Sequence, residues 1–342
     1  MLVANYYSNK DIRLEERPIP KIDEGECLIK IHASSICGSD LMEWYRRDSV
    51  PVVLGHETAG EIIQVGAGVN HLKVGDRVVA SHHVPCLECR HCRRGHETIC
   101  QTLHTTTFDP GGFSQYVRLP KINTRLGVFP IPGNVTYEEA SFAEPLACVL
   151  RGQNRVNLSS GDVVAVVGSG ISGILHIALA KARGAECIIA ADINKKRLPR
   201  AKKFGADIVT KVSNSIPDML IDKTGRKADI VILTTGHPEA VQAGFDIAEE
   251  GAMILIFAPS DPNTTVQIDI NKLFFKHDRS VTTTYANSPK DLKEALKLIS
   301  EKKVPVADMI THRIALDEIQ YGFDLVQNGL ESLKVIVEPN SN

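Results

Sequence analysis

The sequence predicts an α/β protein in which a doubly wound parallel sheet is joined to a second, β-rich domain. The continuous apolar runs at residues 163–167 and 187–191, and the largely apolar run at 228–233, are typical of strands buried on both faces of a parallel sheet. Stretches with helical spacing alternate with these runs, as in repeated strand–helix units. The first 80 residues differ, because short β-favouring runs there are separated by glycines. A chain of 342 residues is long enough for about two domains.

The composition is that of an ordinary globular protein, with 43% hydrophobic and 23% charged residues. A formal net charge of -2 suggests no large electrostatic surface for nucleic acid or an anionic membrane. No apolar run approaches the roughly 18 residues that span a bilayer, and the N-terminus lacks the pattern of a signal peptide. We therefore expect a cytoplasmic protein without nucleic-acid or membrane partners. Because cytoplasmic thiols stay reduced, the eight cysteines are interpreted as metal ligands and packing residues.

The N-terminal part predicts a compact, barrel-like β domain. Residues 1–36 have the pattern of strands, and short β-rich runs continue at 60–66 and 74–80. Strands this short, separated by turns, are typical of small barrels.

A cysteine, a histidine and a glutamate form a candidate metal site in this domain. Cys37 begins a Cys-Gly-Ser-Asp sequence, and His56 and Glu57 follow Gly55. These side chains bind zinc well, and a catalytic zinc has a few protein ligands and one open position. Ser39 is close enough in sequence for its hydroxyl to reach that position. Taken alone, the residues also fit a buried free cysteine and a surface His-Glu pair.

Four further cysteines follow in a C-x2-C-x2-C-x7-C pattern, namely Cys86, Cys89, Cys92 and Cys100. Four thiolates at this spacing can surround one tetrahedral zinc. An iron–sulfur cluster is the alternative, but the bacterial ferredoxin run has three residues before its last cysteine and a proline after it. Here seven residues intervene and Gln101 follows, which favours zinc. Such a site is closed, so we expect it to fold a loop rather than to catalyse.

A dinucleotide-binding fingerprint follows the first buried strand. The strand at 163–167 runs into Gly168, Ser169, Gly170, Ile171, Ser172 and Gly173. A G-x-G-x-x-G is weak alone, but here a helical stretch follows and a second strand ends in an acid about 20 residues further on. The glycines permit a tight turn and the close approach of a pyrophosphate to the helix N-terminus.

The acid at the end of that second strand, Asp192, indicates NAD as the cofactor. Its carboxylate can accept hydrogen bonds from the adenosine ribose hydroxyls and would repel a 2′-phosphate. Lys195, Lys196 and Arg197 follow closely, and a nearby arginine can accommodate that phosphate, so NADP stays open as the alternative.

The remaining pattern continues the alternation of strands and helices. The stretch 142–148 begins a helix-like segment that reaches about residue 156, and an acid before Pro145, namely Glu144, suits a helix N-terminus. Further strands are expected at 207–209, 228–233, 253–257 and 333–337, and further helices at 216–224, 238–249 and 289–302.

With both cysteine patterns and the fingerprint in this order, the whole chain resembles the zinc-dependent medium-chain dehydrogenase/reductase family. In particular it is similar to the polyol (sorbitol or iditol) and threonine dehydrogenase branch. The matching stretches are 37–40, 55–57, the four-cysteine loop, 144–146 and 168–173. The resemblance implies a GroES-like β-barrel catalytic domain at 1–145 with a structural zinc lobe at about 82–104, a Rossmann NAD-binding domain at 146–286, and a return to the catalytic domain at 287–342.

The resemblance also implies roles at the catalytic metal. Cys37 and His56 would bind zinc, and Glu57 would bind it directly or exchange with water. Glu144 would take the place of a cysteine ligand of liver-type alcohol dehydrogenases and hold the metal or its water. Ser39 would take the alcohol proton.

Near the nicotinamide, the resemblance points to three further residues. Thr235 and Gly236 follow a buried strand, where the cofactor ring lies in the family. Tyr285 would lie near both the nicotinamide and the substrate.

The chain departs from the family close to the candidate metal site. The family commonly has a proton-relaying histidine five residues after the zinc cysteine, and Met42 stands there. Glu43 replaces an aromatic that lines the substrate pocket of sorbitol dehydrogenases. It would either bind a polar group of the substrate or lie on the surface and pair with Arg46 and Arg47.

The sequence therefore predicts a zinc-dependent oxidoreductase that transfers hydride between NAD and a secondary alcohol or ketone, with two zinc ions per chain. A polyol, an inositol-like compound or an amino-polyol is the first substrate class, and L-threonine or a simple alcohol is the alternative. A non-catalytic NAD-binding sensor and a zinc-ribbon nucleic-acid module are rival interpretations. The intact set of candidate ligands argues against the sensor, and the cysteine loop lacks the helix spacing of groove-reading fingers. The family implies a homodimer or homotetramer.

Overall fold

The computed structural model describes residues 1–341 and divides the chain into two compact units. The first unit comprises Met1–Ala147, Ala286–Lys302 and Val306–Asn342, and the second comprises Cys148–Tyr285 and Lys303–Pro305. Helix α6 (Ala143–Arg155) crosses the boundary between them along the chain. Each unit is described separately.

A mixed seven-stranded sheet forms the centre of the first unit. Its order is β15-β16-β3-β5-β6-β8, with β7 also paired to β3, and only β15 and β16 run parallel. Alternate side chains of β3 and β5, such as Ile29, Ile31 and Ile62, are fully buried in one core. The strands are β3 (Cys27–Ser35), β5 (Glu57–Val65), β6 (Arg77–Ala80), β7 (Tyr116–Leu119), β8 (Val128–Pro130), β15 (Ile310–Ala315) and β16 (Lys334–Glu338).

A smaller antiparallel sheet in the order β2-β1-β4 completes the β structure of this unit. It consists of β1 (Leu2–Ser8), β2 (Asp11–Glu16) and β4 (Val52–Val53). Short helices connect the strands: α1 (Glu43–Arg46), α2 (Arg90–Arg93), α3 (Gln101–Thr105), α4 (Lys121–Leu126) and α5 (Tyr137–Ser141), with 3-10 turns η1 (Gly38–Leu41) and η2 (Glu97–Ile99).

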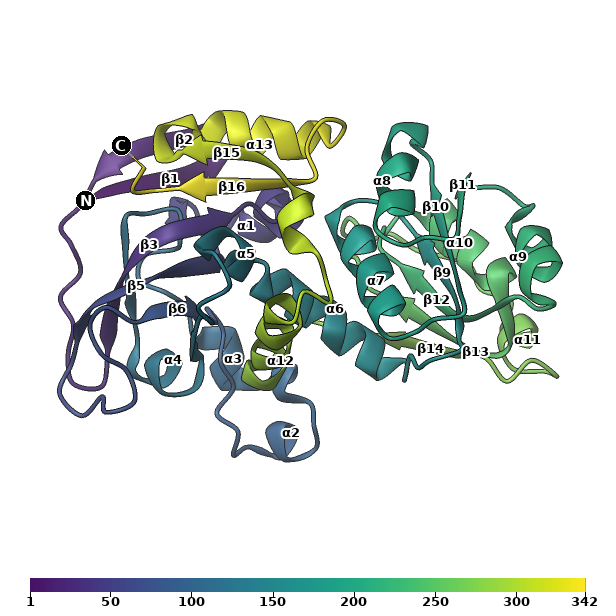
Figure 1. The fold of residues 1–342 in the computed structure, drawn as a ribbon, viewed down its shortest axis with the longest axis horizontal. Helices are drawn as coiled ribbons and strands as arrows, with labels where there is room; N and C mark the ends of the chain where they lie inside the picture. The colour runs from purple at the N-terminus through teal and green to yellow at the C-terminus, as the bar shows by residue number, and fades with distance from the viewer. Residues whose placement is uncertain (342) are drawn as a thin grey trace. The chain divides into compact units, whose positions relative to one another are not determined.

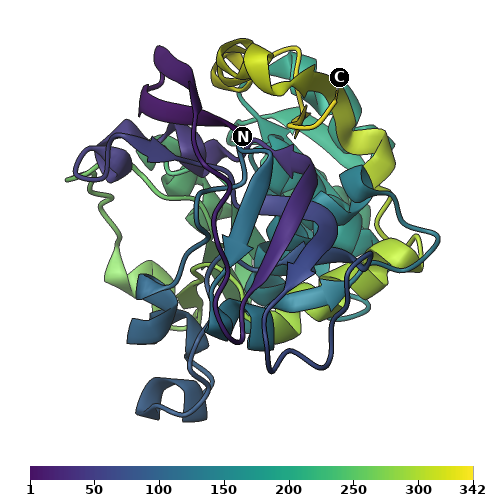
Figure 2. The same cartoon turned by 90° about the vertical axis from the view of Figure 1, so that its left-hand side faces the viewer.

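The C-terminal part of the chain lies with the N-terminal part in this unit (Figures 1 and 2). Strand β16 pairs with β3, so that Ile336 lies opposite Ser35. Phe323 packs with its ring centroid 5.9 Å from that of Tyr6. The elements of this return are α12 (Pro289–Ser300), η4 (Val306–Met309), η5 (Leu316–Glu318) and α13 (Ile319–Asn328), together with β15 and β16.

A six-stranded parallel sheet forms the second unit, in the order β11-β10-β9-β12-β13-β14. From β9 the chain adds β10 and β11 on one side. It then returns and adds β12, β13 and β14 on the other side of β9. The strand order therefore switches direction between β9 and β12. The strands are β9 (Val163–Val167), β10 (Cys187–Asp192), β11 (Ile208–Lys211), β12 (Ala228–Leu233), β13 (Ala248–Ile256) and β14 (Ser280–Thr283). The helices are α7 (Ile171–Ala182), α8 (Leu198–Lys203), α9 (Ile216–Thr224), α10 (Pro238–Ile247) and α11 (Ile270–Leu273), with the turn η3 (Lys195–Arg197).

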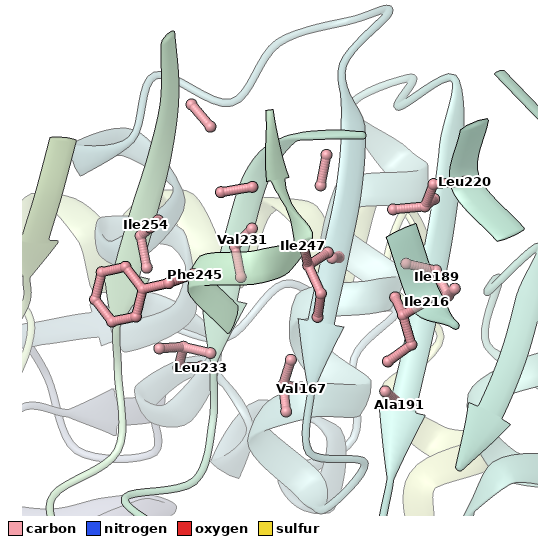
Figure 3. Close-up of a cluster of buried hydrophobic side chains, with 14 of the residues drawn as sticks. Val167, Ile189, Ala191, Ile216, Leu220, Val231, Leu233, Phe245, Ile247 and Ile254 are labelled. Atoms are coloured by element: carbon pink, nitrogen blue, oxygen red, sulfur yellow. The ribbon is translucent and has the colours of Figure 1, made fainter. Parts of the chain in front are cut away.

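One face of this sheet packs against α9 and α10 (Figure 3). Every second residue of the central strands, including Val167 and Val231, points into this core beside Phe245 of α10. All five residues of β9 are buried, as expected for a strand covered on both faces. This is the doubly wound parallel sheet that the sequence predicted.

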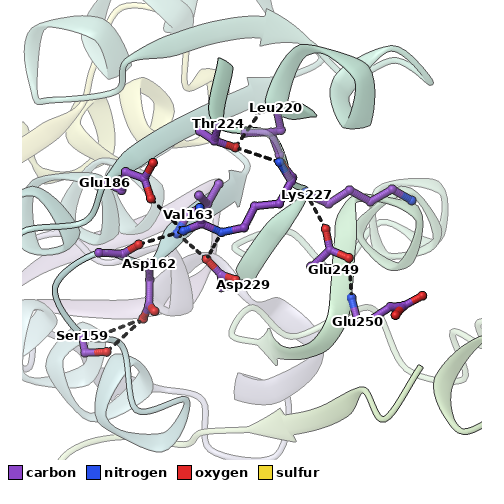
Figure 4. Close-up of polar contacts among 12 residues, drawn as sticks. Ser159, Asp162, Val163, Glu186, Leu220, Thr224, Lys227, Asp229, Glu249 and Glu250 are labelled. Atoms are coloured by element: carbon purple, nitrogen blue, oxygen red, sulfur yellow. Dashed lines mark hydrogen bonds and ion pairs between the residues drawn. The ribbon is translucent and has the colours of Figure 1, made fainter. Parts of the chain in front are cut away.

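Polar contacts stabilise the opposite end of the sheet from the glycine-rich turn (Figure 4). Arg226 contacts Glu186 at 2.7 Å and Asp229 at 3.2 Å, and Asp229 accepts a hydrogen bond from the N–H of Val163 at 2.7 Å. These contacts join the beginnings of β9 and β12 through side chains.

The largest differences from the sequence prediction lie at helix α10 and at strands β13 and β14. Helix α10 ends at Ile247, and β13 already begins at Ala248, where the sequence predicted helix to residue 249. Gly251 has a φ of 76°, which a helix does not allow, and the β13 residues 248–252 are too polar to be recognised as a strand. Strand β14 was not predicted because its sequence, Ser-Val-Thr-Thr, lacks an apolar run.

Among residues 1–341, no helix is long and apolar enough to cross a membrane.

Candidate active site

Cys37, His56 and Glu57 lie together in the first unit. Their candidate ligand atoms are all within 4.8 Å of one another. The cause is strand pairing: Ser35 at the end of β3 lies opposite Glu57 at the start of β5, so Cys37 meets the His-Glu pair. Gly55 precedes them with a φ of 95°, and a Cβ there would lie 2.6 Å from the Phe113 nitrogen. Only glycine fits this turn.

Asp40 supports the histidine of this group. Its Oδ1 lies 3.3 Å from His56 Nδ1, and its Oδ2 accepts a hydrogen bond from the Cys37 N–H at 3.0 Å. Burial would raise the pKa of Asp40, but His56 and the Cys37 N–H outweigh it and hold the pKa below its ordinary value. A carboxylate on one imidazole nitrogen leaves the other to bind a metal.

Lys334 supports the glutamate. The Lys334 ammonium and the Glu57 carboxylate form an ion pair in which both side chains are almost fully buried. Burial alone would lower the pKa of Lys334, but Glu57 outweighs it and raises the pKa. Lys334 also donates to the Ile36 carbonyl at 3.2 Å. The Glu57 carboxylate at the candidate metal group is therefore negatively charged, and the Lys334 ammonium neutralises that charge.

Ser39 lies at the same group, because its hydroxyl donates to Cys37 Sγ at 3.4 Å. Ser39 lies in the turn η1, and Met42 is the residue at which this turn ends. The Met42 side chain has no group that can carry a proton. Glu43 is exposed, and its carboxylate accepts a hydrogen bond from the Asn9 N–H at 2.8 Å. Within residues 1–341 it forms no ion pair with Arg46, contrary to the surface pairing that the helical spacing suggested.

Glu144 lies near the group but outside the set within 4.8 Å. It is on α6 and only 8% exposed. Its Oε1 accepts a hydrogen bond from the Asn287 amide at 2.9 Å, and its charge helps to raise the pKa of Lys334.

The four cysteines of the loop come together as the sequence predicted. The Sγ atom of Cys86 lies 4.0 Å from that of Cys92 and 3.6 Å from that of Cys100. The Sγ atoms of Cys89 and Cys92 are 3.5 Å apart. A tetrahedral zinc with Zn–S bonds of about 2.3 Å requires sulfur separations of roughly 3.8 Å. Burial opposes ionisation of Cys100, but N–H groups of Cys86 and Leu103 outweigh it and lower its pKa to about 6. The geometry and the N–H donors therefore fit a structural metal.

The glycine-rich turn of the second unit lies at the carboxyl end of β9, where the strand order switches. Gly168 has a φ of 103°. A Cβ on Gly173 would lie 2.0 Å from the Gly168 carbonyl oxygen, so that helix α7 packs closely on the turn. A Cβ on Gly170, the residue before α7, would meet nothing within 4 Å. Open space before a helix N-terminus fits a pyrophosphate. Ile171 and Ser172 form the first turn of that helix.

Asp192 ends β10 beside this turn and is 3% exposed. One carboxylate oxygen accepts from the Ser169 N–H and the other from the Asn194 N–H, both at 2.7 Å. Arg197 lies 3.9 Å away. Asp192 therefore stabilises the turn, a contact that the sequence did not predict.

The three residues expected near the nicotinamide are also in the second unit. Thr235 and Gly236 lie in the loop after β12, and a Cβ on Gly236 would lie 2.2 Å from the Pro259 carbonyl oxygen. Tyr285 is 46% exposed and ends the unit.

Sequence reasoning missed the supporting residues Asp40, Lys334 and Asn287. The sequence could have indicated a role for Lys334. This lysine begins the apolar run Lys-Val-Ile-Val, and a lysine buried there needs a partner for its charge. Asp40 was part of the quoted Cys-Gly-Ser-Asp motif but had no assigned role. Asn287 carried no signal, because its contact with Glu144 joins residues 143 positions apart.

The comparison with known families agrees with this geometry. Residues 23–132 match the alcohol dehydrogenase GroES-like domain, and residues 172–301 match the zinc-binding dehydrogenase family. L-threonine 3-dehydrogenase of Bacillus subtilis is 35% identical over 340 residues, which cover 95% of this chain and 94% of that protein. The chain belongs to the zinc-dependent medium-chain dehydrogenase family.

Further relatives place it in the polyol and threonine dehydrogenase branch of that family, as the resemblance predicted. Sorbitol dehydrogenase of Ovis aries is 31% identical over 337 residues, covering 96% of this chain and 93% of that protein. The medium-chain dehydrogenase fold, with a GroES-like domain and a Rossmann domain, is thereby confirmed, and the protein is an oxidoreductase of the alcohol and polyol dehydrogenase type.

Two solved structures of relatives contain cofactors. An alcohol dehydrogenase of Escherichia coli complexed with NADH has a TM-score of 0.88 and 26% identity, with 99% of both chains covered. A zinc-binding dehydrogenase of Sinorhizobium meliloti bound to NADP has a TM-score of 0.86 and 26% identity, again with 99% of both chains covered. Family membership therefore fits a nicotinamide cofactor without deciding between NAD and NADP.

Proposed function

We propose that this dehydrogenase uses zinc and NAD to interconvert a secondary alcohol and its ketone. The proposed substrates are polyols, inositol-like compounds or amino-polyols. The observation that carries the proposal is the group of Cys37, His56 and Glu57, with the Ser39 hydroxyl in contact with the Cys37 sulfur. A zinc-binding group and a nucleotide-binding turn in one chain are what such a reaction requires.

The donor set fits a catalytic zinc. One thiolate, one imidazole and one carboxylate suit this metal, and three ligands leave a position open. Asp40 holds the imidazole of His56, and Lys334 balances the charge of Glu57. When bound, zinc supplies a Lewis acid for the alcohol oxygen, and NAD supplies the two-electron acceptor for the carbon-bound hydrogen.

Ser39 is proposed to accept the alcohol proton. Its hydroxyl is at the metal group, and Met42 cannot carry the proton onward. Ser39 therefore passes it to a ribose hydroxyl of the cofactor, to water or to another side chain. Glu144 is proposed to bind the metal or its water, with the Asn287 amide holding its carboxylate in place.

NAD is the proposed cofactor. The glycine-rich turn would bind the pyrophosphate above Gly170, and Asp192 would bind the ribose hydroxyls. Asp192 is buried and bonded to two N–H groups, so a 2′-phosphate would meet a fixed negative charge. Arg197, 3.9 Å from Asp192, partly offsets that charge. Thr235, Gly236 and Tyr285 are proposed to contact the nicotinamide end.

A second zinc is proposed for the four-cysteine loop, where four sulfurs leave no position for a substrate. The sulfur separations of 3.5–4.0 Å support this role. Its function would be to hold the loop in its fold.

L-threonine or a simple alcohol is the alternative substrate, since an L-threonine 3-dehydrogenase is among the relatives. A screen of NAD reduction by purified protein across polyols, inositols, amino alcohols and L-threonine tests the proposal, with the zinc content measured in parallel. We expect two zinc ions per chain and turnover of at least one polyol. One zinc ion and no turnover would favour a non-catalytic NAD sensor. From the family, we propose a cytoplasmic homodimer or homotetramer.

A further inference from the structure

Arg46 is a partly buried cation beside the candidate metal group. It is the last residue of α1, and its side chain is only 21% exposed. Its Nη2 lies 3.5 Å from the carbonyl oxygen of Ser39, whose hydroxyl contacts Cys37 Sγ. Ser39 thus touches both the guanidinium and a candidate zinc ligand. The positive charge of Arg46 therefore stands close to the place where an alcohol would react.

One donor of this guanidinium is unused. An arginine has five N–H groups in a fixed fork. Its Nε is buried and has no hydrogen-bond partner among residues 1–341. The Asp40 carboxylate is 3.9 Å away and already holds His56 and the Cys37 N–H. A buried donor without a partner is unfavourable, so an acceptor placed beside this side chain would stabilise it.

Beyond Asp40, the described side chains around Arg46 orient its guanidinium and do not neutralise its positive charge. The guanidinium carbon lies 4.7 Å from the centroid of the Tyr45 ring, so the ring face covers one side of the fork. Glu43, the acid at helical spacing from Arg46, is bonded to the Asn9 N–H instead. His82 lies beside His56, with ring centroids 5.0 Å apart. A histidine ring carries no negative charge in either of its forms, so His82 does not pair with Arg46.

We propose that Arg46 binds an anionic group of the alcohol substrate, a carboxylate or a phosphate, and so selects acidic substrates over neutral ones. The inference rests on the proposed dehydrogenase reaction and changes the preferred substrate from a neutral polyol to a secondary alcohol that carries an anionic group. A planar guanidinium fork matches both anions, because each presents two oxygens at the right spacing. A hydroxy acid, a hydroxy amino acid such as L-threonine, or a phosphorylated polyol would satisfy it.

The test compares substrates that differ only in the anion. Wild-type enzyme is assayed with a six-carbon polyol, the aldonate of the same configuration and the corresponding polyol phosphate, with L-threonine as a fourth arm. The variants are Arg46→Gln, which removes the charge, and Arg46→Lys, which keeps the charge but loses the fork. Arg47→Gln is the matched control, because Arg47 is the next residue, carries the same charge and is exposed. Circular dichroism and zinc content establish that each variant folds.

We expect wild type to prefer an anionic substrate, and the preferred arm distinguishes carboxylate from phosphate. Arg46→Gln should raise the KM for that substrate by about 10- to 100-fold, the range expected for a charge-assisted hydrogen bond. It should change kcat/KM for the neutral polyol much less than for the anionic substrate, and Arg47→Gln should change neither by more than about twofold. Arg46→Lys should fall between Arg46→Gln and wild type. Malonate or inorganic phosphate should inhibit wild type competitively against the alcohol, which tests the anion site without any variant.

Other results would overturn the inference. If wild type oxidises the neutral polyol but not the aldonate, the polyol phosphate or L-threonine, and neither malonate nor phosphate inhibits, the proposed function stands and the anion site is rejected. If Arg46→Gln raises the KM for NAD equally with every alcohol, Arg46 binds the cofactor instead. Turnover of no alcohol in the panel would reject the proposed function and this inference with it.

Discussion

At the scale of single residues, the candidate site depends on charges that are buried in pairs. Lys334 and Glu57 are almost fully buried, and Asp40 is fully buried beside His56. A buried charge is tolerated only with a partner, because its desolvation costs several kcal/mol. Each supporting residue therefore fixes the charge and orientation of one proposed ligand before any metal binds.

Removing Lys334 should expose this dependence. Lys334→Met leaves the Glu57 carboxylate buried without its partner, and we expect a loss of about 3–5 kcal/mol in the free energy of unfolding. The double variant Lys334→Met with Glu57→Gln should recover part of that loss, because the orphaned charge is gone. Denaturant unfolding of the four proteins gives the coupling energy. Additive effects of the two substitutions would show that the ion pair does not stabilise the site.

Asp192 combines two roles that substitutions can separate. Asp192→Ala removes the charge and the acceptors of the Ser169 and Asn194 N–H groups, so we expect weaker NAD binding and a smaller preference for NAD over NADP. Asp192→Asn keeps one acceptor oxygen without the charge and should relax the preference while preserving more of the affinity. Steady-state kinetics with both cofactors measure both effects. A wild-type preference for NADP would contradict the assignment.

His176, on α7, should make the stability pH-dependent. It is fully buried, and burial, with a smaller contribution from Arg183, lowers its pKa to about 3. In the unfolded chain its pKa is about 6.5, so below pH 6.5 only the unfolded state takes up this proton. The free energy of unfolding should therefore fall by about 2 kcal/mol from pH 6.5 to 5 on account of this residue, and continue to fall toward pH 3.

The variant His176→Gln isolates that contribution. Its stability should depend less steeply on pH over the same range, whereas His71→Gln, at an exposed histidine, should keep the wild-type slope. Urea unfolding at a series of pH values measures the slopes. Parallel slopes for His176→Gln and wild type would show that the buried histidine does not cause the dependence.

At the scale of elements, the sequence predicted a helix, strand or turn correctly where a local residue pattern was enough to identify it. Strand β9 is apolar at every position, and the glycine turn after it has a known geometry, so both were predicted with their neighbours. Strand β14 carries Ser-Val-Thr-Thr and is a strand only because β13 pairs with it. The contacts of Lys334 with Glu57 and of Arg46 with Ser39 depend on how segments meet in the fold, and sequence spacing does not contain that information.

The cysteine loop is an element that depends on its metal. Among the described residues, its small core consists of the four cysteines and Leu103. Short helices of four or five residues cannot hold such a loop without further support. Cys92→Ser should therefore lower the melting temperature and remove one of two zinc ions, while the protein that remains folded keeps its turnover per active site. Unchanged zinc content and stability in Cys92→Ser would contradict the structural role.

At the scale of the whole molecule, the proposed function needs both units, one for the metal group and one for the nucleotide. The first unit contains the proposed metal group, the proposed proton acceptor and the cysteine loop, and the second unit contains the proposed nucleotide-binding turn. The family relationship covers both units, which agrees with a chain that carries both parts of one reaction. The central claim is that the group around Cys37 is the catalytic zinc site.

The most direct test is the variant Cys37→Ser, measured for zinc content, thermal unfolding and NAD reduction with the best alcohol. We expect one zinc ion per chain instead of two, a melting temperature close to that of wild type, and a loss of turnover of at least about 1,000-fold, as for the removal of an essential catalytic group. NAD binding, followed by fluorescence, should be unchanged, because the nucleotide turn lies in the other unit. If Cys37→Ser keeps two zinc ions and the wild-type rate, the catalytic assignment is wrong.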